Sequence, residues 1–499
     1  MKITNMEKSF QALVATKKKQ GSAIAYALVI IAMVSILLSS VVRFIVTQVN
    51  NAYQVQSREE AFQIAESGVN FYHWYLAHQT DGKNSAQVRD FWSNTSPYPY
   101  GINTPFEKEY VDAQGAAIGK FKIEVQKPDT GSTIVNVKVT GWTYKYPMVK
   151  RIIAVRLRRP SWSEYSVLID EFTRFGSGWD IKGKIMSNTG VDFDGVAHNT
   201  VYSGLLSYFN TDYGTTRPGV ATNWPSEYNT DSASNVFLGG KQFPYTQKDF
   251  GGVTADLSSM KTLAMAPNGT TVNGCSAAGC HFTVIAGQKG RHLILKSDGT
   301  FDLKTVTSVK TGANYNTINA EGSATNYTIP NNGIIFVDGD TWVEGTINTK
   351  RVTIVAAIMP ATATNANIYL GINDIKYTNF DGKDAIGLIA QGDVETLHDG
   401  KNDLVVDAAI LAQNGMIGQN DRNPTCCTAV CAGLKNSVTF FGSLASKHRL
   451  ILLIGRNCAS NYYYGYYYRA LEYDNNMLYY PPPYFPTGTQ YNVDQWEEQ

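Results

Sequence analysis

An uncharged apolar segment near the N-terminus constrains this chain more than any other feature of its sequence. Ser22 to Val42 contains no charged residue, and Ile, Leu, Val, Ala and Met fill most of it. A helix of about 20 apolar residues spans the hydrocarbon core of a membrane. The segment is longer than the apolar region of a secretory signal, and no small-residue cleavage site follows it. The sequence therefore predicts a transmembrane helix over residues 22–47.

The charges that precede this segment predict its orientation. Five lysines but only one acidic residue, Glu7, lie between Met1 and Gly21. Positive residues favour the cytoplasmic side of a membrane. We therefore expect a single pass through the inner (cytoplasmic) membrane, with the N-terminus in the cytoplasm. Everything after about Val49 is then extracytoplasmic.

The boundary between the basic and apolar parts has its own pattern. Lys17–Lys19 are followed by Gly21 and then by Ser22, which opens the apolar helix. This order resembles the class III leader of type IV prepilins, in which a membrane peptidase cuts after the glycine and the new N-terminus is methylated. The resemblance implies a leader over residues 1–21, cut between Gly21 and Ser22. At the fifth mature position the family usually has Glu, whereas this chain has Tyr26. Some minor pilins at fibre tips also lack this Glu. A leader-like anchor that is never cleaved is the alternative.

Residues 48–160 combine a helical pattern with alternating runs. The segment "AFQIAESGVNFY" repeats apolar residues near the helical period. With Ala61, Ala65, Glu66, Ser67 and Gly68 it resembles the region after the membrane helix in PilX-like minor pilins. The runs "KFKIEVQKP", "STIVNVKVTGW" and "VKRIIAVRLRRP" alternate apolar and polar residues, which is typical of antiparallel strands. We expect an α+β pilin-like region, in which the long helix packs on a small antiparallel sheet.

Residues 165–455 contain short apolar pieces between glycines and small polar residues, such as "GIIFVDGDTWVEGTI", "IGLIAQGDV" and "DAAILAQNG". Strands of three to five residues separated by tight turns are typical of stacked rungs. The pieces also resemble the C-terminal β-helix-like domains of large bacterial surface proteins with prepilin-type N-termini. We predict a mainly-β parallel β-solenoid domain, with a β-sandwich as the alternative.

The cysteines all lie in the second half of the chain, at Cys275, Cys280, Cys426, Cys427, Cys431 and Cys458. In an extracytoplasmic region we expect disulfides, and the loop between Cys275 and Cys280 suits a local one. Zinc is the competing interpretation of the last four thiols, although their spacing lacks the usual C-x2-C pairs. Free buried thiols are a third. We predict disulfides, with open connectivity, and no metal site.

Residues 456–499 form a Tyr- and Pro-rich tail. Tyrosines supply rigid amphipathic contact area, so Tyr463, Tyr466 and Tyr467 are candidate contacts for carbohydrate or protein. The other interpretation is that the tail wraps the open end of the solenoid and covers its apolar rungs.

Catalytic patterns are weak by comparison. Carboxylates recur at Asp192, Asp194, Asp338, Asp340, Asp374, Asp381 and Asp393, with His198 close to the first pair. Carboxylates two apart on a strand share a face and could bind Ca²⁺ or act as acid and base, but Asp before Gly is also ordinary turn chemistry. We expect no catalytic residue, no cofactor and no enzyme activity. A net charge of +1 gives no basic field for nucleic acid.

Together these features predict a minor pilin-like, membrane-tethered surface subunit of a type IV pilus or related filament system. Its expected role is structural, at a tip, or adhesive. The expected partners are the membrane, prepilin peptidase, other pilin subunits, and carbohydrate or protein on another surface. The alternative is a surface-anchored β-helix protein that binds or degrades polysaccharide.

Overall fold

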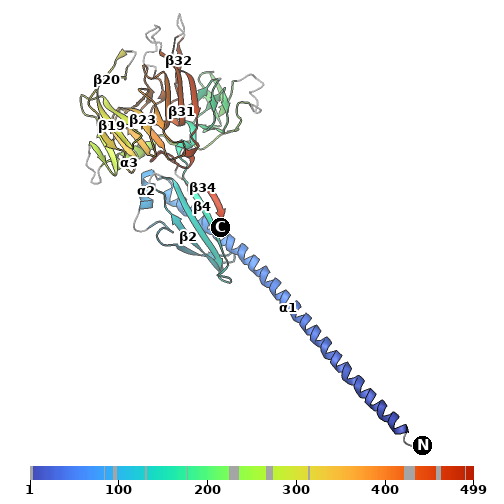
Figure 1. Cartoon of the computed structure of the whole chain (residues 1–499). Helices are drawn as coiled ribbons and strands as arrows, with labels where there is room; N and C mark the ends of the chain where they lie inside the picture. Colours follow the sequence, from blue (N-terminus) through green and yellow to red (C-terminus); the bar gives the residue numbers. More distant parts are fainter. Residues whose placement is uncertain are drawn as a thin grey trace.

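The structure is a computed structural model of the chain. It describes residues 4–83, 85–93, 98–129, 132–176, 178–223, 235–265, 273–312, 315–420, 433–456, 462–488 and 490–499. A long helix leads into a small α+β domain, and a larger β domain lies beyond it (Figure 1).

Helix α1 (Thr4–Thr80) has 77 residues, which corresponds to about 115 Å at 1.5 Å per residue. Its N-terminal part projects away from the rest of the molecule (Figure 1). Every side chain from Ala23 to Gln56 is exposed, although an 18-residue window of this part has a mean hydropathy of 2.6. The helix is therefore long and apolar enough to cross a membrane, as predicted.

The C-terminal part of α1 packs on a five-stranded antiparallel sheet. The strands lie in the order β1 (Phe106–Val111), β2 (Ala117–Gln126), β3 (Ile134–Thr143), β4 (Lys150–Arg158) and β34 (Asn492–Glu498). A short helix, α2 (Ser85–Ser93), adds Val88, Phe91 and Trp92 to the core. The predicted antiparallel sheet is present, and its fifth strand comes from the C-terminus of the chain.

Two small residues let the helix approach the sheet closely. A Cβ atom on Gly141 of β3 would lie 2.3 Å from the carbonyl oxygen of Ala61 and 2.5 Å from the backbone nitrogen of Ala65. A Cβ on Gly68 of the helix would lie 2.6 Å from Cγ1 of Val139. Real Cβ contacts are not that short, because interiors are already close-packed. The small residues in the helical pattern therefore permit close packing.

The larger domain consists mainly of parallel strand pairs in three columns. The first column has the order β17 (Gly279–Thr283), β22 (Ile334–Asp338), β24 (Arg351–Ala356), β27 (Ala385–Ala390), β29 (Asp403–Ala412), β31 (Gly433–Ser446), β5 (Tyr165–Ile169), β8 (Lys184–Ser187), β11 (Val201–Ser203) and β15 (Lys241–Gln242).

The third column shares β29 and β31 with the first, and the second and third columns share β23 (Thr341–Ile347). The second runs through β18 (Gly290–Leu295), β23, β25 (Ile368–Leu370), β28 (Val394–Thr396) and β30 (Ile417–Gly418). The third runs from β23 through β26 (Ile375–Tyr377), β29, β31, β33 (Tyr462–Glu472), β7 (Asp180–Ile181) and β10 (Val196–Ala197). A separate parallel set joins β6 (Thr173–Phe175), β9 (Val191–Phe193) and β14 (Val220–Ala221).

Further strands pair in antiparallel fashion with strands of these columns or with one another. They are β12 (Ser207–Asn210) with β13 (Thr215–Pro218), β16 (Gly274–Ser276) on β17, β19 (Thr300–Val309) with β20 (Ile318–Glu321) and β21 (Thr325–Thr328), and β32 (Leu453–Arg456) on β33. Within the described segments, 3-10 turns span Trp162–Glu164 and Asn475–Leu478.

The chain joins the first column in its middle. From β4 it passes into β5, and β8, β11 and β15 then extend the column in one direction. Helix α3 (Val253–Ala264) lies on the outer face of the column, and the chain resumes at the opposite end with β17. It returns strand by strand until β31 pairs with β5, so strands about 280 residues apart in sequence become neighbours.

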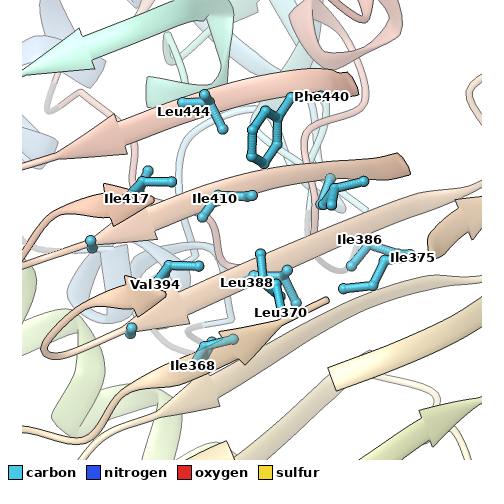
Figure 2. Close-up of a cluster of buried hydrophobic side chains, with 14 of the residues drawn as sticks. Ile368, Leu370, Ile375, Ile386, Leu388, Val394, Ile410, Ile417, Phe440 and Leu444 are labelled. Atoms are coloured by element: carbon cyan, nitrogen blue, oxygen red, sulfur yellow. The ribbon is translucent and has the colours of Figure 1, made fainter. Parts of the chain in front are cut away.

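An aliphatic ladder holds the first column together. Its members occupy one register, each directly opposite the next, and all are buried. They are Cys280, Ile335, Ile354, Leu388, Ile410, Leu444, Val167, Ile185 and Val201. Leu388, Ile410 and Leu444 point into the same interior as Ile368, Val394 and Ile417 of the second column (Figure 2). No single strand could bury this face alone, so stacking supplies the core.

Residues 456–499, which the sequence analysis sets apart as a tail, are divided between the two domains. Strand β33 is part of the third column, and β34 completes the antiparallel sheet. The segment between them crosses the domain junction, where Phe485 and Met477 are buried against the larger domain and Tyr491 against the smaller.

Candidate functional site

The predicted cleavage position lies within helix α1. Gly21 and Ser22 belong to the continuous helix Thr4–Thr80, and cleavage between them stays a prediction. Tyr26 lies in the apolar part of the helix and is 70% exposed. Its ring faces outward among other exposed apolar side chains, such as Ile30 and Met33. A carboxylate buried at this position would carry a charge that needs a partner, whereas a tyrosine is neutral and costs less to bury.

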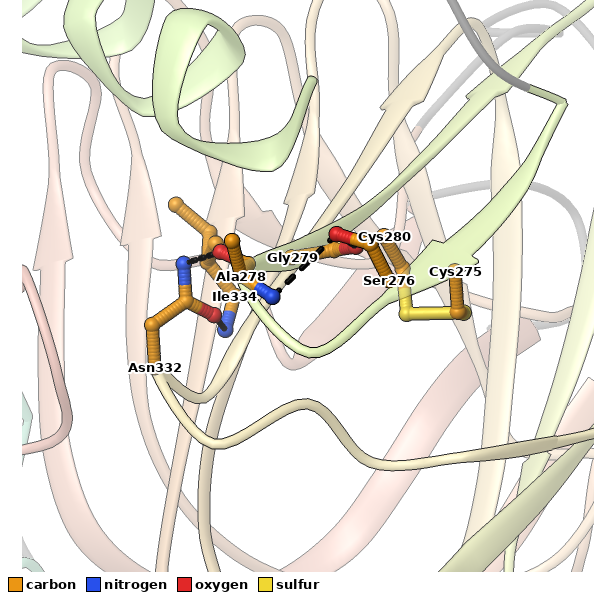
Figure 3. The surroundings of a disulfide bond; sticks show 7 residues. All are labelled: Cys275, Ser276, Ala278, Gly279, Cys280, Asn332 and Ile334. Carbon is orange, nitrogen blue, oxygen red and sulfur yellow. Dashed lines mark hydrogen bonds between the residues drawn. A yellow bond between two sulfur atoms is a disulfide. The ribbon is translucent and has the colours of Figure 1, made fainter. Parts of the chain in front are cut away.

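The disulfide between Cys275 and Cys280 is present, at the tip of the β16–β17 hairpin (Figure 3). The two cysteines are directly opposite each other in the antiparallel pair. The hydroxyl of Ser276 accepts a hydrogen bond from the backbone N–H of Ala278 at 3.1 Å, and Asn332 donates to the carbonyl oxygen of Ala278. The disulfide therefore closes a hairpin whose turn is already held from two sides. Cys426, Cys427, Cys431 and Cys458 lie outside the described residues.

The candidate tyrosines of β33 do not share one environment. Tyr463 and Tyr467 are 45% and 55% exposed, and the adjacent Tyr468 is 63% exposed. Tyr466 is fully buried, and its hydroxyl donates to the carbonyl oxygen of Lys401 at 3.1 Å. The prediction that Tyr466 contacts a ligand therefore needs correction, because this ring belongs to the core of the larger domain.

Behind Tyr466 lies a buried lysine. The ammonium of Lys435 donates to the carbonyl oxygen of Leu397 and lies 4.5 Å from the centre of the Tyr466 ring. Burial lowers the pKa of Lys435 to about 8, and the charge of Asp399 opposes that shift. Residues two apart in a regular strand lie on the same face, so Tyr466 and Tyr468 would be expected to have similar exposure. Instead Tyr466 is buried and Tyr468 is exposed.

The first pair of candidate carboxylates is tied into its own loop. Asp192 is fully buried, and its Oδ2 accepts from the side chains of Asn223 at 2.8 Å and Arg217 at 3.3 Å. Burial raises the pKa of Asp192, against these hydrogen bonds. Asp194 accepts from the backbone N–H of Asn223 at 2.6 Å. His198 instead pairs with Asp180 at 2.8 Å. These contacts describe a structural polar cluster around Asn223.

Asp338 holds helix α3 on the first column. Its two oxygens accept from Lys261 of the helix and from His281 of β17, both at 2.8 Å. Burial disfavours the charged form, yet these two hydrogen bonds hold the pKa of Asp338 below its ordinary value. The remaining candidates serve turns and neighbouring lysines: Asp340 accepts from the N–H of Asn367, Asp393 from that of Met416, Asp374 pairs with Lys376 and Lys401, and Asp381 pairs with Lys383.

Within the described residues, no three His, Cys, Asp or Glu side chains gather so that they could hold a metal ion. The hydrogen bonds and ion pairs of the candidate carboxylates therefore serve mainly to hold strands and turns in place.

Three hollows were not found from the sequence. One, about 530 Å³, lies along the small sheet and is lined by residues of β2, β3, β4 and β34, among them Glu124, Lys138 and Arg156. A second, about 320 Å³, lies in the larger domain beside Trp179, Asp180 and Asp194. A third, about 220 Å³, lies at the domain junction. Each brings together segments that are distant in sequence, so no local motif marks it.

The sequence matches no protein-family model and no curated protein sequence. Among solved structures it is similar to the crystal structure of the competence-associated pilin ComZ from Thermus thermophilus, with 13% identity over 89% of this chain and 97% of that chain. The TM-score of this match is 0.25, and at that value the likeness carries no conclusion about this chain.

Proposed function

We propose that this protein is a minor pilin-like subunit, tethered to a membrane by α1, that displays its larger β domain at the cell surface. One observation carries the proposal: a single helix exposes its apolar N-terminal part and packs its C-terminal part on an antiparallel sheet. An exposed apolar helix of this length needs a lipid bilayer or a bundle of like helices around it. A membrane offers the first environment, and a filament of such subunits offers the second.

The larger domain favours a tip or adhesive role without catalysis. We propose that its three parallel columns form a β-solenoid. A domain of this bulk would crowd a thin fibre if every subunit carried one. The carboxylates predicted as catalytic alternatives are engaged in hydrogen bonds and ion pairs, which supports a structural use for them.

Processing and orientation are part of the same proposal. We propose cleavage by prepilin peptidase between Gly21 and Ser22, methylation of Ser22, and a PilX-like relation of the region that follows. The N-terminus then lies in the cytoplasm, and both β domains lie on the far side of the inner membrane. Other pilin subunits are the expected partners of the exposed helix. Tyr26 suits a subunit that has no forward neighbour to pair with.

Mass spectrometry of the protein purified from membranes tests this proposal. We expect a mature N-terminus at a methylated Ser22. Gly21→Phe should block cleavage, because a bulky side chain fills the space that the peptidase needs, whereas Gln11→Phe adds the same bulk away from the cleavage position and should not. An intact Met1 in the unaltered protein would refute processing and leave a plain anchored surface protein.

The exposed tyrosines of β33 are the proposed adhesive contacts. Replacing Tyr467 and Tyr468 together with Ala should weaken attachment of the purified protein to carbohydrate-coated or protein-coated surfaces, because each exposed ring offers contact area. Tyr480→Ala is the matched control, since Tyr480 is 52% exposed but lies after β33, on the segment that leads back to β34 (the return segment). Equal loss in both variants would contradict a specific role for β33.

Polysaccharide binding by the larger domain is the second candidate, and one hollow favours it. Trp179 lines this hollow together with Asp180 and Asp194, and an aromatic ring beside carboxylates suits a sugar ring. Trp179→Ala should then abolish polysaccharide binding measured by calorimetry and leave the β33 contacts unchanged. Release of reducing ends from a polysaccharide would further indicate degradation, against the role without catalysis.

A further inference from the structure

A hollow of about 220 Å³ lies where the smaller domain meets the segment that returns from the larger one. Four parts of the chain line it. They are helix α2, the two ends of the β2–β3 connection, Arg159 after β4, and the return segment through Pro481, Pro482, Tyr484, Phe485, Thr487 and Tyr491. The return segment is anchored on the larger domain by Pro483, whose carbonyl oxygen accepts from the hydroxyl of Thr353 at 2.5 Å. A ligand in this hollow would therefore touch both sides of the junction.

Arg159 is the most unusual residue of the hollow. It follows β4 directly and is only 6% exposed. Among the described residues its guanidinium has no hydrogen bond and no ion pair. Burial lowers the pKa of Arg159, against the favourable charges of Tyr491 and Asp256, but a guanidinium stays protonated in proteins. Burial leaves this cation with little water around it, so a hydrogen-bonded partner in the hollow would stabilise it.

Two further donors in the hollow lack an acceptor. The hydroxyl of Thr487 is buried and has no hydrogen-bond partner. The hydroxyl of Tyr491 accepts a hydrogen bond from Nε1 of Trp92 at 2.8 Å, so its own proton is left to donate. Thr487, Tyr491 and Arg159 all line the same hollow. Unsatisfied buried donors that share a cavity indicate a missing acceptor.

The charges at the rim are mainly positive. Arg89 lies over the ring of Tyr484, with 5.4 Å between the guanidinium carbon and the ring centre, and Lys127 is exposed. Asp129 is the one acidic residue among the lining residues. With Arg159 the lining therefore carries three cations and one anion, and its field attracts a negative ligand.

We propose that this hollow binds an oxyanion, a carboxylate or phosphate group, with Arg159 as its principal partner and Thr487 and Tyr491 as neutral donors. A guanidinium presents parallel N–H groups that match two oxygens of either group. The bound anion supplies the acceptors that the three donors lack. Because it touches α2, the two ends of the β2–β3 connection and the return segment, it also stabilises the junction between the domains.

Thermal unfolding of the full chain in detergent micelles tests the proposal, with inorganic phosphate, sodium glucuronate and sodium chloride compared at equal ionic strength. Phosphate or glucuronate should raise the midpoint of unfolding above that in chloride. A shift with phosphate alone assigns a phosphate ligand, a shift with glucuronate alone assigns an acidic sugar or similar carboxylate, and a shift with both assigns the shared chemistry.

Variants connect the effect to the hollow. Arg159→Met should lose the shift and weaken anion binding, measured by calorimetry, about tenfold or more, because hydrogen bonds to charged groups are the strongest contacts available here. Lys138→Met, which removes an exposed charge elsewhere on the same sheet, should keep the shift. Thr487→Val preserves size and should weaken binding several-fold while leaving the midpoint in chloride unchanged.

Two results would overturn the proposal. One is the absence of any shift in the unaltered protein, and the other is a shift that Thr487→Val and Arg159→Met retain in full. If Arg159→Met does not fold, Thr487→Val and Arg159→Lys decide, since the first removes one neutral donor and the second keeps the charge but removes the paired N–H groups.

Discussion

Truncating Leu444 should destabilise the larger domain where β31, from the later part of the chain, pairs with β5, from the start of the domain. Leu444 lies in the ladder of the first column, opposite Ile410 on one side and Val167 on the other. It is 1% exposed. Because β31 and β5 pair here, the side chain supports both the strands that precede it in sequence and those at the start of the domain.

The expected size of the effect follows from burial. Leu444→Ala removes three carbon atoms from a closed interior, worth about 2.4 kcal/mol at about 0.8 kcal/mol each. A cavity that neighbouring strands cannot fill adds roughly 1–2 kcal/mol, because the ladder residues above and below are fixed by their own strands. We therefore expect a loss of about 3–5 kcal/mol in the free energy of unfolding.

Leu434→Ala is the matched control, since it makes the same substitution on the same strand where the side chain is 50% exposed. It should cost less than about 0.5 kcal/mol. Urea unfolding of the full chain, followed by tryptophan fluorescence, measures both variants, and hydrogen exchange of peptides from β5 and β8 localises the effect. Leu444→Ala should expose these peptides to exchange.

Equal losses for the two variants would refute the reasoning, because the buried ladder would then contribute no more than an exposed leucine. Unchanged exchange in β5 and β8 would refute the continuity of the column at β31, even if the overall stability fell.

Three other predictions concern the helix contact, a buried charge and the hairpin. Gly141→Ala should cost about 1–3 kcal/mol and speed proteolysis of the C-terminal part of α1, because its Cβ would meet the helix backbone at 2.3 Å; Gly322→Ala, where the nearest atom would lie at 3.9 Å, should not. The pKa of Lys435 is lowered from 10.5 to about 8, so between these pH values the unfolded chain binds more protons and stability should rise with pH, by up to about 3 kcal/mol. Urea unfolding from about pH 8 to about pH 10.5 measures this rise, which Lys435→Met should abolish. Replacing Cys275 and Cys280 with Ala should cost about 2 kcal/mol, because the disulfide closes a loop of only 5 residues; a loss above about 4 kcal/mol would show that the hairpin depends on the bond.

The sequence by itself determined the features that depend on neighbours along the chain. The apolar helix follows from an uncharged run longer than a membrane is thick. Strands β2, β3 and β4 follow from local alternation, since one face of an antiparallel sheet is buried. The short loop between Cys275 and Cys280 suggested a local disulfide, although the sequence left the pairing open. In each case the physical cause acts within a short segment, so the pattern is visible before folding.

Only the tertiary structure decided how distant segments meet. Strands buried on both faces carry no alternation, so Leu444 and Val167 cannot be recognised as neighbours from their own surroundings. The exposed Tyr467 and the buried Tyr466 likewise look alike in the sequence, because an unbroken run of tyrosines shows no alternation. The hollow around Arg159 depends on a return segment more than 300 residues later. Burial and unmatched hydrogen-bond donors are properties of the packed molecule, because they exist only after those segments have come together.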